Sequence, residues 1–294
     1  MKSVFSEIRD KVVFDEPLSK HTTFRIGGPC WVWAEVRDEK ELRKILKLAK
    51  LKKKRVVIIG NGSNLLAGDR GLRAVVIRLA GRHFKKVRFA GPTVKAGAGA
   101  HLRHLVNLAC RRALKGTEGL AGIPGTLGGA IFMNAGYEGN ISDCLESVRV
   151  MDKRTGKILV LKKAKIKFNY RHSDLDGYII LGATLCLKKD DKKKLLKRKN
   201  KLLRIKKKEQ PLGSPSAGCV FKNPRRALPA ARYIDMLGFK GKGIGGAKVS
   251  EKHANFIINS KDAKASDVLR LMEIIKRRVK SEFGVELTPE ITIL

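Results

Sequence analysis

Two glycine-rich segments are the parts of this chain whose residue types point most directly to chemistry. The first runs from Ile59 to Asp69 with the sequence IGNGSNLLAGD, and the second from Gly119 to Gly136 with the sequence GLAGIPGTLGGAIFMNAG. Glycine at this density lets the backbone approach a ligand closely and turn its N–H groups toward it. Two such segments, about one supersecondary unit apart, predict an extended ligand with phosphates, such as a dinucleotide.

Neither segment matches a common phosphate-binding motif. Both lack the pattern G-x-x-x-x-G-K-[ST] and the dinucleotide fingerprint G-x-G-x-x-G. A pair of ordinary tight turns therefore stays open as the alternative interpretation of these residues.

Three short polar sites could add reactive side chains. They are FNYRHS at 168–173, SAGCVFKNP at 216–224 and TPEITIL at 288–294. Taken alone, Arg171 could form a surface ion pair, Cys219 could fill a core, and Glu290 could face solvent from a strand. Spacing along the chain does not show that the three sites converge.

Cysteine and histidine usage argues against several other kinds of site. The five cysteines have no C-x-x-C spacing, which favours neither a disulfide framework nor a zinc site. We expect all except Cys219 to be buried apolar residues. The six histidines do not form an H-x-x-x-H motif, so we expect no metal site, and no histidine spacing recommends a cysteine hydrolase.

Composition bounds the class of protein. The 294 residues suffice for two or three domains, and 43% of them are hydrophobic. There is no apolar run of 18 residues, and Met1–Asp10 mixes charges, so we expect a cytoplasmic protein without a membrane span. The net charge of +37 indicates either a solvated lysine-rich surface or attraction to polyanions.

The pattern of apolar residues predicts a mixed α and β chain whose composition changes near residues 188–210. Too few helices are present for a doubly wound sheet, and Lys192–Lys208 reads as a basic amphipathic connecting helix. The other predicted helices are 38–53 with Asp38 as N-cap, 101–115 ending at Gly116, 229–237, and 267–283 with Ser266 as N-cap and Gly284 at its end. The predicted strands are 56–59, 74–79, 94–98, a hairpin of 148–151 with 158–161, 178–187, 255–259 and 286–294.

Taken together, the motifs resemble the UDP-N-acetylenolpyruvoylglucosamine reductase (MurB) family, flavoenzymes of peptidoglycan precursor synthesis. Seven of them follow in order along nearly the whole chain. They are His21–Gly28, Gly60–Leu66, Ala121–Ala130 with Asn134–Gly136, Tyr170–Arg171, Ser216–Pro224, Gly245–Ser250 with His253–Asn259, and Pro289–Glu290. The short length and the His253–Phe256 form resemble the compact type II of the family, which lacks an inserted substrate-gating loop.

The resemblance implies an α+β fold with a two-part FAD-binding module of the vanillyl-alcohol-oxidase (PCMH) type. This module would span residues 1–190, with subdomains at about 1–80 and 81–190. A basic connecting helix at 191–210 and a substrate-binding α+β domain at 211–294 would follow. We expect a monomer with a UDP-sugar as substrate and no nucleic-acid partner.

The resemblance also implies the reaction and its residues. NADPH would reduce a non-covalent FAD, and the reduced flavin would reduce the enolpyruvyl group of the UDP-sugar to give UDP-N-acetylmuramate. Arg171 and Glu290 match the positions that stabilise the resulting enolate, for which Glu290 would have to carry or share a proton. The residues that would hold FAD are Gly60, Asn61, Gly62, Ser63, Asn64, Leu65, Gly122, Ile123, Pro124, Gly125, Thr126, Gly128, Gly129, Ala130 and Asn134.

The sequence departs from the family pattern at three places. Cys219 occupies the place of the general acid, where most members of the family carry serine, and a thiol is the stronger acid of the two. Tyr170, Lys207 and Asn223 are the expected substrate-binding residues, but Glu209 interrupts the basic residues before Gln210, so Lys208 stays open as the alternative to Lys207. Ile291 and Thr292 stand where relatives often carry arginine.

Two alternatives remain at this stage. An FAD oxidase or dehydrogenase of the same fold would act on alcohols or hydroxy acids, often with a covalent histidyl flavin, for which His21 is the candidate. A basic nucleic-acid-binding module would depend on charge alone and would leave both glycine segments unexplained.

Overall fold

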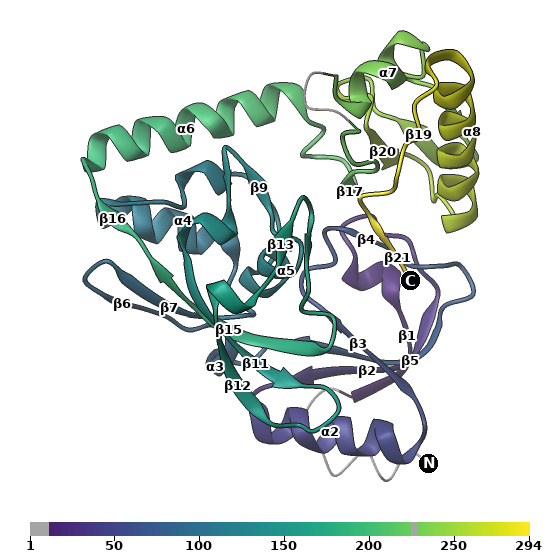
Figure 1. Ribbon diagram of the computed structural model, residues 1–294. Helices are drawn as coiled ribbons and strands as arrows, with labels where there is room; N and C mark the ends of the chain where they lie inside the picture. Colours follow the sequence, from purple (N-terminus) through teal and green to yellow (C-terminus); the bar gives the residue numbers. More distant parts are fainter. Residues whose placement is uncertain (1–11, 225–227) are drawn as a thin grey trace. The chain divides into compact units, whose positions relative to one another are not determined.

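The computed structural model describes residues 12–224 and 228–294, so the charge pattern of Met1–Asp10 lies outside the described residues. The chain forms two compact units (Figure 1). The first unit contains residues 32–60 and 74–204 together with 12–14, and the second contains 15–31, 61–73 and 205–294. The domain limits expected from the sequence stay a prediction.

Most of a four-stranded sheet, in the order β1-β2-β5-β3, belongs to the first unit. Its strands are Val12–Pro17, Pro29–Val36, Leu72–Leu79 and Arg55–Ile59, and β3 runs parallel to β5. Helix α2 (Glu39–Leu51) connects β2 to β3 and buries one apolar stripe. The Asp38 carboxylate accepts the Glu41 N–H at 2.9 Å, which confirms the predicted N-cap.

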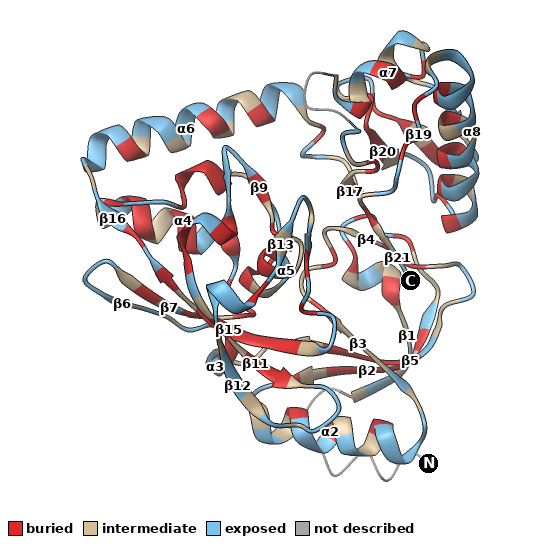
Figure 2. Cartoon of the chain, viewed as in Figure 1, coloured by how far each residue is buried: buried red, intermediate tan, exposed pale blue. Residues whose placement is uncertain are grey.

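The second sheet of the first unit is antiparallel, with the order β12-β11-β15-β7-β6. The sheet contains the predicted 148–161 hairpin, and Figure 2 shows β15 mostly buried. Its strands are Ile158–Lys162, Leu145–Asp152, Tyr178–Cys186, Thr93–Gly97 and Val87–Ala90, and the helices beside it are α3 (Arg82–Lys85), α4 (Leu102–Arg111) and α5 (Leu127–Phe132). Short pairs add β8 (Leu114–Lys115) with β16 (Lys188–Lys189), β9 (Gly136–Tyr137) with β10 (Gly139–Asn140), and β13 (Phe168–Asn169) with β14 (His172–Ser173).

Helix α6 (Lys192–Glu209) confirms the predicted basic helix. Leu195 and Leu202 are buried along it, as the leucine spacing requires. In the first unit its Lys199 Nζ donates to Asn107 Oδ1 of α4 at 3.0 Å. The lysine-rich run therefore packs by its apolar stripe while most of its charges face solvent.

The second unit combines a four-stranded antiparallel sheet with two helices. The sheet order is β17-β20-β19-β18, with strands Ser216–Cys219, Phe256–Asn259, Ala247–Val249 and Gly243–Ile244. Helix α7 (Ala230–Met236) packs against α8 (Ala265–Phe283), and α8 also contacts β18 and β19. The core of this unit includes Phe24, Ile26 and Leu66 from its two N-terminal segments.

Three predicted element ends are wrong. Helix α4 stops at Arg111 because Ala113 adopts a left-handed conformation (φ +57°) and the next two residues join β8, so Gly116 is not its end. Helix α8 begins at Ala265, so Ser266 is not its N-cap. The C-terminal strand is only β21 (Thr292–Ile293), paired in parallel with β4 (Leu65–Leu66), rather than all of 286–294.

The cysteines differ from expectation at one position. Cys186 is exposed at the end of β15, whereas the other three that we expected to be buried are so. Burial raises the pKa of Cys30 and Cys110 to about 11 and that of Cys144 to about 12. Within residues 12–224 and 228–294, none of the helices has the length and apolarity needed to cross a membrane.

Candidate functional site

The first glycine loop follows β3 and packs against residues 21–23. Gly62 has φ +62°, and a Cβ there would lie 2.2 Å from the His21 carbonyl oxygen. The Thr23 N–H donates to the Gly62 carbonyl oxygen at 3.2 Å. Because both the dihedral angle and the space exclude a side chain, the glycine is required for this close approach.

The second glycine loop leads into helix α5 and is hydrogen-bonded to the residues that follow β7. The Gly128 N–H donates to the Ala98 carbonyl oxygen at 2.8 Å, and Thr126 Oγ1 caps α5 by accepting the Gly129 N–H at 3.4 Å. A Cβ on Gly60 would lie 2.5 Å from the same Thr126 Oγ1. Within the first unit, the start of the first loop therefore abuts the second loop, as a shared ligand requires.

Gly60 and the second glycine loop, which lie together in the first unit, fit FAD. A Cβ on Gly60 would clash with the Thr126 side chain, and a glycine-rich backbone of this kind can turn its N–H groups toward a pyrophosphate. Asn134, just beyond α5, is 6% exposed, and its Oδ1 has no hydrogen-bond partner among the described residues. A buried amide oxygen without a donor is costly, and a bound group can supply that donor.

Arg171 lies in the first unit, at the turn of the β13–β14 hairpin. The two strands pair Phe168 with Ser173 and Asn169 with His172, so Tyr170 and Arg171 form a two-residue turn. Arg171 adopts φ +56°, and its guanidinium carbon lies 5.1 Å from the centre of the Tyr170 ring. Tyr170 is 49% exposed, so the pair presents a cation beside an aromatic ring that a ligand can reach.

Cys219 and Glu290 come together in the second unit. Cys219 ends β17, and the next residue, Val220, accepts the Glu290 N–H at 2.8 Å. Asn64 of the first glycine loop donates from Nδ2 to the Glu290 carbonyl oxygen at 3.1 Å. The Asn64 carbonyl oxygen accepts the Thr292 N–H at 2.9 Å. The residue that follows the predicted acid, the backbone of Glu290 and one predicted cofactor loop therefore share one hydrogen-bonded network.

The predicted substrate residues Lys207 and Asn223 have different surroundings. Lys207 is exposed on α6, whereas its neighbour Lys206 is only 4% exposed. A run of three lysines does not indicate which one is buried, so sequence reasoning missed Lys206. Asn223 Oδ1 accepts the Ala230 N–H at 3.1 Å and thereby caps α7.

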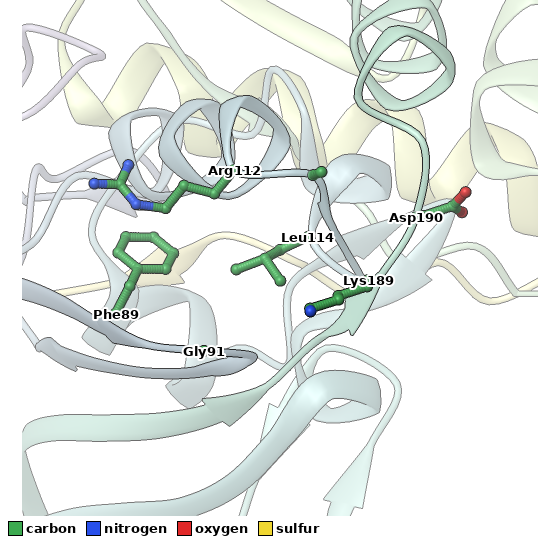
Figure 3. A pocket seen from close by; sticks show the side chains of 7 residues that line it. Phe89, Gly91, Arg112, Leu114, Lys189 and Asp190 are labelled. Carbon is green, nitrogen blue, oxygen red and sulfur yellow. The ribbon is translucent and has the colours of Figure 1, made fainter.

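Two cavities lie apart from most of these residues. The first has a volume of about 450 Å³ in the first unit and is lined by none of the predicted site residues; its Arg112 guanidinium carbon lies 4.5 Å from the centre of the Phe89 ring (Figure 3). Lys189 points into the same space. The second cavity, of about 580 Å³, lies beside the start of α8 in the second unit.

Asp69 takes up the N–H groups at the start of α8. Its carboxylate accepts the Ala265 N–H at 2.6 Å and the Ser266 N–H at 3.0 Å. Burial acts to raise the pKa of Asp69, but these hydrogen bonds outweigh it and leave the pKa below its usual range. The Asp69 carboxylate therefore supplies the negative charge at the N-terminus of α8.

Comparison with known proteins first defines the class. A family model for an FAD binding domain matches residues 32–162, and a model for the C-terminal domain of UDP-N-acetylenolpyruvoylglucosamine reductase matches residues 210–294. A wild-type Physcomitrella patens BBE-like 1 structure shares the fold, with a TM-score of 0.50 at 15% identity over 64% of this chain and 44% of that one. The chain is therefore an oxidoreductase with an FAD-binding domain, and the expected fold class is confirmed.

Closer relatives define the family. The crystal structure of the Thermus caldophilus UDP-N-acetylenolpyruvylglucosamine reductase (MurB) has a TM-score of 0.82 at 38% identity, covering 97% of this chain and 98% of that one. The reductase of Caldanaerobacter subterraneus is 42% identical over 100% of this chain and 96% of its own length. That of Alkaliphilus oremlandii is 41% identical over 97% and 94%. The chain belongs to the UDP-N-acetylenolpyruvoylglucosamine reductase (MurB) family, which confirms the resemblance.

Proposed function

We propose that this chain reduces UDP-N-acetylglucosamine enolpyruvate to UDP-N-acetylmuramate, with NADPH as reductant, in peptidoglycan precursor synthesis. The observation that carries the proposal is the hydrogen-bonded network that joins Asn64, Glu290 and Val220, the residue after Cys219. The network supports the proposal because it joins the segments that carry the proposed proton donor, Cys219, and the proposed carboxyl group, Glu290, to the first glycine loop. The family membership of the chain supports this reaction over oxidation of an alcohol and over nucleic-acid binding.

Bound FAD supplies the chemistry of hydride transfer from NADPH to C3 of the enolpyruvyl group. The chain then has to stabilise the negative charge that develops on the substrate carboxylate. The Arg171 guanidinium and a protonated Glu290 carboxyl are suited to donate hydrogen bonds to that oxyanion. The Cys219 thiol completes the reduction by giving its proton to C2.

Other residues of the chain bind and orient the substrate in this proposal. Tyr170 offers a half-exposed ring beside Arg171. Lys207 and Asn223 are the candidates for the nucleotide and its phosphates. Only the Asn223 Nδ2 group is proposed for this contact, because Oδ1 already accepts the Ala230 N–H. The cytoplasmic location and the monomeric state stay predictions.

Separate measurement of the two half-reactions of Cys219→Ala tests the proposal. Reduction of the flavin by NADPH should proceed at the wild-type rate, and reoxidation by the enolpyruvyl UDP-sugar should be abolished. Cys219→Ser should keep substantial turnover because a hydroxyl can still donate the proton. Cys186→Ser changes an exposed cysteine and should leave both half-reactions unchanged.

Two outcomes would refute the proposal. If Cys219→Ala reduces the substrate at the wild-type rate, Cys219 is not the acid. If wild-type flavin is reoxidised rapidly by oxygen but not by the UDP-sugar, the oxidase alternative replaces the reductase.

A further inference from the structure

The hairpin that carries Arg171 is fastened to the end of helix α5 by two side-chain hydrogen bonds. Asn134 Nδ2 donates to the Asn169 carbonyl oxygen at 3.0 Å. In the opposite direction, Ser173 Oγ donates to the Phe132 carbonyl oxygen at 2.8 Å. One bond holds the strand that precedes the Tyr170–Arg171 turn, and the other holds the strand that follows it.

Both fastening side chains are buried, so their hydrogen bonds are structurally specific. Ser173 has no exposed surface, and Asn134 is 6% exposed. Because the Asn134 side chain faces a carbonyl oxygen, its NH2 group has to be the one that points there. Asn134 also adopts φ +42°, a left-handed conformation that few residues other than glycine tolerate, and Arg171 does the same at +56°.

The other end of α5 leads to the predicted cofactor cradle. Its N-cap is Thr126, which abuts Gly60. The helix has six residues, which corresponds to a length of about 9 Å. One short helix thus connects the loop suited to the FAD pyrophosphate with the hairpin that carries Arg171.

From this geometry we infer that Asn134 and Ser173 are positioning residues for Arg171 in the reduction of the substrate. The inference rests on the proposed function. Neither residue has to contact the substrate in this role. Each restrains the hairpin, so that the Arg171 guanidinium is already oriented toward the developing oxyanion. Misplacement of a catalytic group by about 1 Å can lower a rate by about a hundredfold.

Ser173→Ala and Asn134→Asp in the flavin-loaded enzyme test the inference. Ser173→Ala removes one hydroxyl, and Asn134→Asp replaces the donor NH2 group with an acceptor of the same shape. In Ser173→Ala, flavin reduction by NADPH should stay within about twofold of the wild-type rate, and in both variants reoxidation by the UDP-sugar should slow by about ten- to a hundredfold. Ser260→Ala is the matched control, since Ser260 Oγ also donates to a backbone carbonyl oxygen at 2.8 Å but lies in the second unit.

A double-mutant cycle separates positioning from a general loss of structure. In an Arg171→Gln background the guanidinium is absent, so Ser173→Ala should slow reoxidation by less than about threefold more. Full multiplication of the two effects would overturn the inference, as would wild-type reoxidation rates in both single variants.

Hydrogen exchange gives a readout that does not depend on the substrate reaction. Amides of residues 168–173 should exchange about two- to tenfold faster in Ser173→Ala than in the wild type, as loss of one hydrogen bond predicts. Unchanged exchange there would overturn the inference even if turnover falls. Failure of wild-type flavin to be reoxidised by the UDP-sugar would instead refute the proposed function, and faster exchange would still support the fastening of the hairpin.

Discussion

Replacing Gly62 with alanine should disturb the first glycine loop by two effects, backbone strain and a steric clash. A residue at φ +62° pays for the left-handed conformation, and the new Cβ would also lie 2.2 Å from the His21 carbonyl oxygen. That oxygen belongs to the backbone and cannot rotate away. Gly91 provides the matched control, because it has φ +56° and no atom within 4 Å of a Cβ.

The two glycines differ by the cost of the clash. Gly91→Ala should cost about 1 kcal/mol, the strain of one residue in the left-handed region. Gly62→Ala adds about 1–3 kcal/mol for forcing a methyl group into filled space. If the loop shifts to relieve the overlap, this energy appears as lost FAD affinity. At about 1.4 kcal/mol per tenfold change, the dissociation constant rises by about 5- to 150-fold.

Fluorescence titration of the apoprotein with FAD measures this difference. Gly91→Ala should bind FAD like the wild type, and Gly62→Ala should bind it more weakly. The gain in Tm on adding FAD should shrink as well, because the stabilisation by a ligand grows with the logarithm of its concentration divided by its dissociation constant. Equal FAD dissociation constants for the two variants would show that the first loop does not hold the cofactor.

Three further predictions follow from other contacts. Asp69→Ala should cost about 2 kcal/mol by uncapping α8, and Asp69→Asn about half of that, as seen in Tm; equal Tm values for all three proteins would contradict the capping role. A thiol reagent at pH 8 should label Cys186 first and Cys219 second in the native protein. The UDP-sugar should slow only the labelling of Cys219. Rapid labelling of the three buried thiols would contradict their burial. Burial lowers the pKa of His253 below its usual value of 6.5, so the folded state binds fewer protons than the unfolded state. Stability should therefore fall as the pH drops below about 6.5, and this part of the pH dependence should vanish in His253→Gln.

Local sequence patterns predicted the parts of the fold whose causes are local. The N-cap at Asp38 involves a residue only three positions away, and the apolar stripe of α2 repeats with the helical period. The end of α8 at Gly284 (φ +64°) was predictable for the same reason. By contrast, the N-cap residue of α8 is Lys264, and the side chain that accepts the first N–H groups of the helix belongs to Asp69, 196 residues from Ala265. A pattern search near Ser266 could not find it.

The C-terminal segment shows the same limit. The sequence predicts a strand over 286–294, but strand pairing depends on which backbone groups lie alongside. Only Thr292 and Ile293 have a partner strand, β4, and Pro289 forms a single bridge to Phe221. The partners of these residues lie far away along the chain, so composition and periodicity contain no signal for them.

The candidate site was predictable as a set of motifs but not as a geometry. The first glycine loop is the clearest case. Its glycines suggested a phosphate cradle, yet Asn64 in the same loop also bonds through its side chain to Glu290 and through its carbonyl oxygen to Thr292. The loop proposed to hold the cofactor therefore also holds the segment proposed to supply the carboxyl group. A movement of this loop would change FAD binding and the position of Glu290 together, so variants here should be judged by both half-reactions and not by cofactor affinity alone.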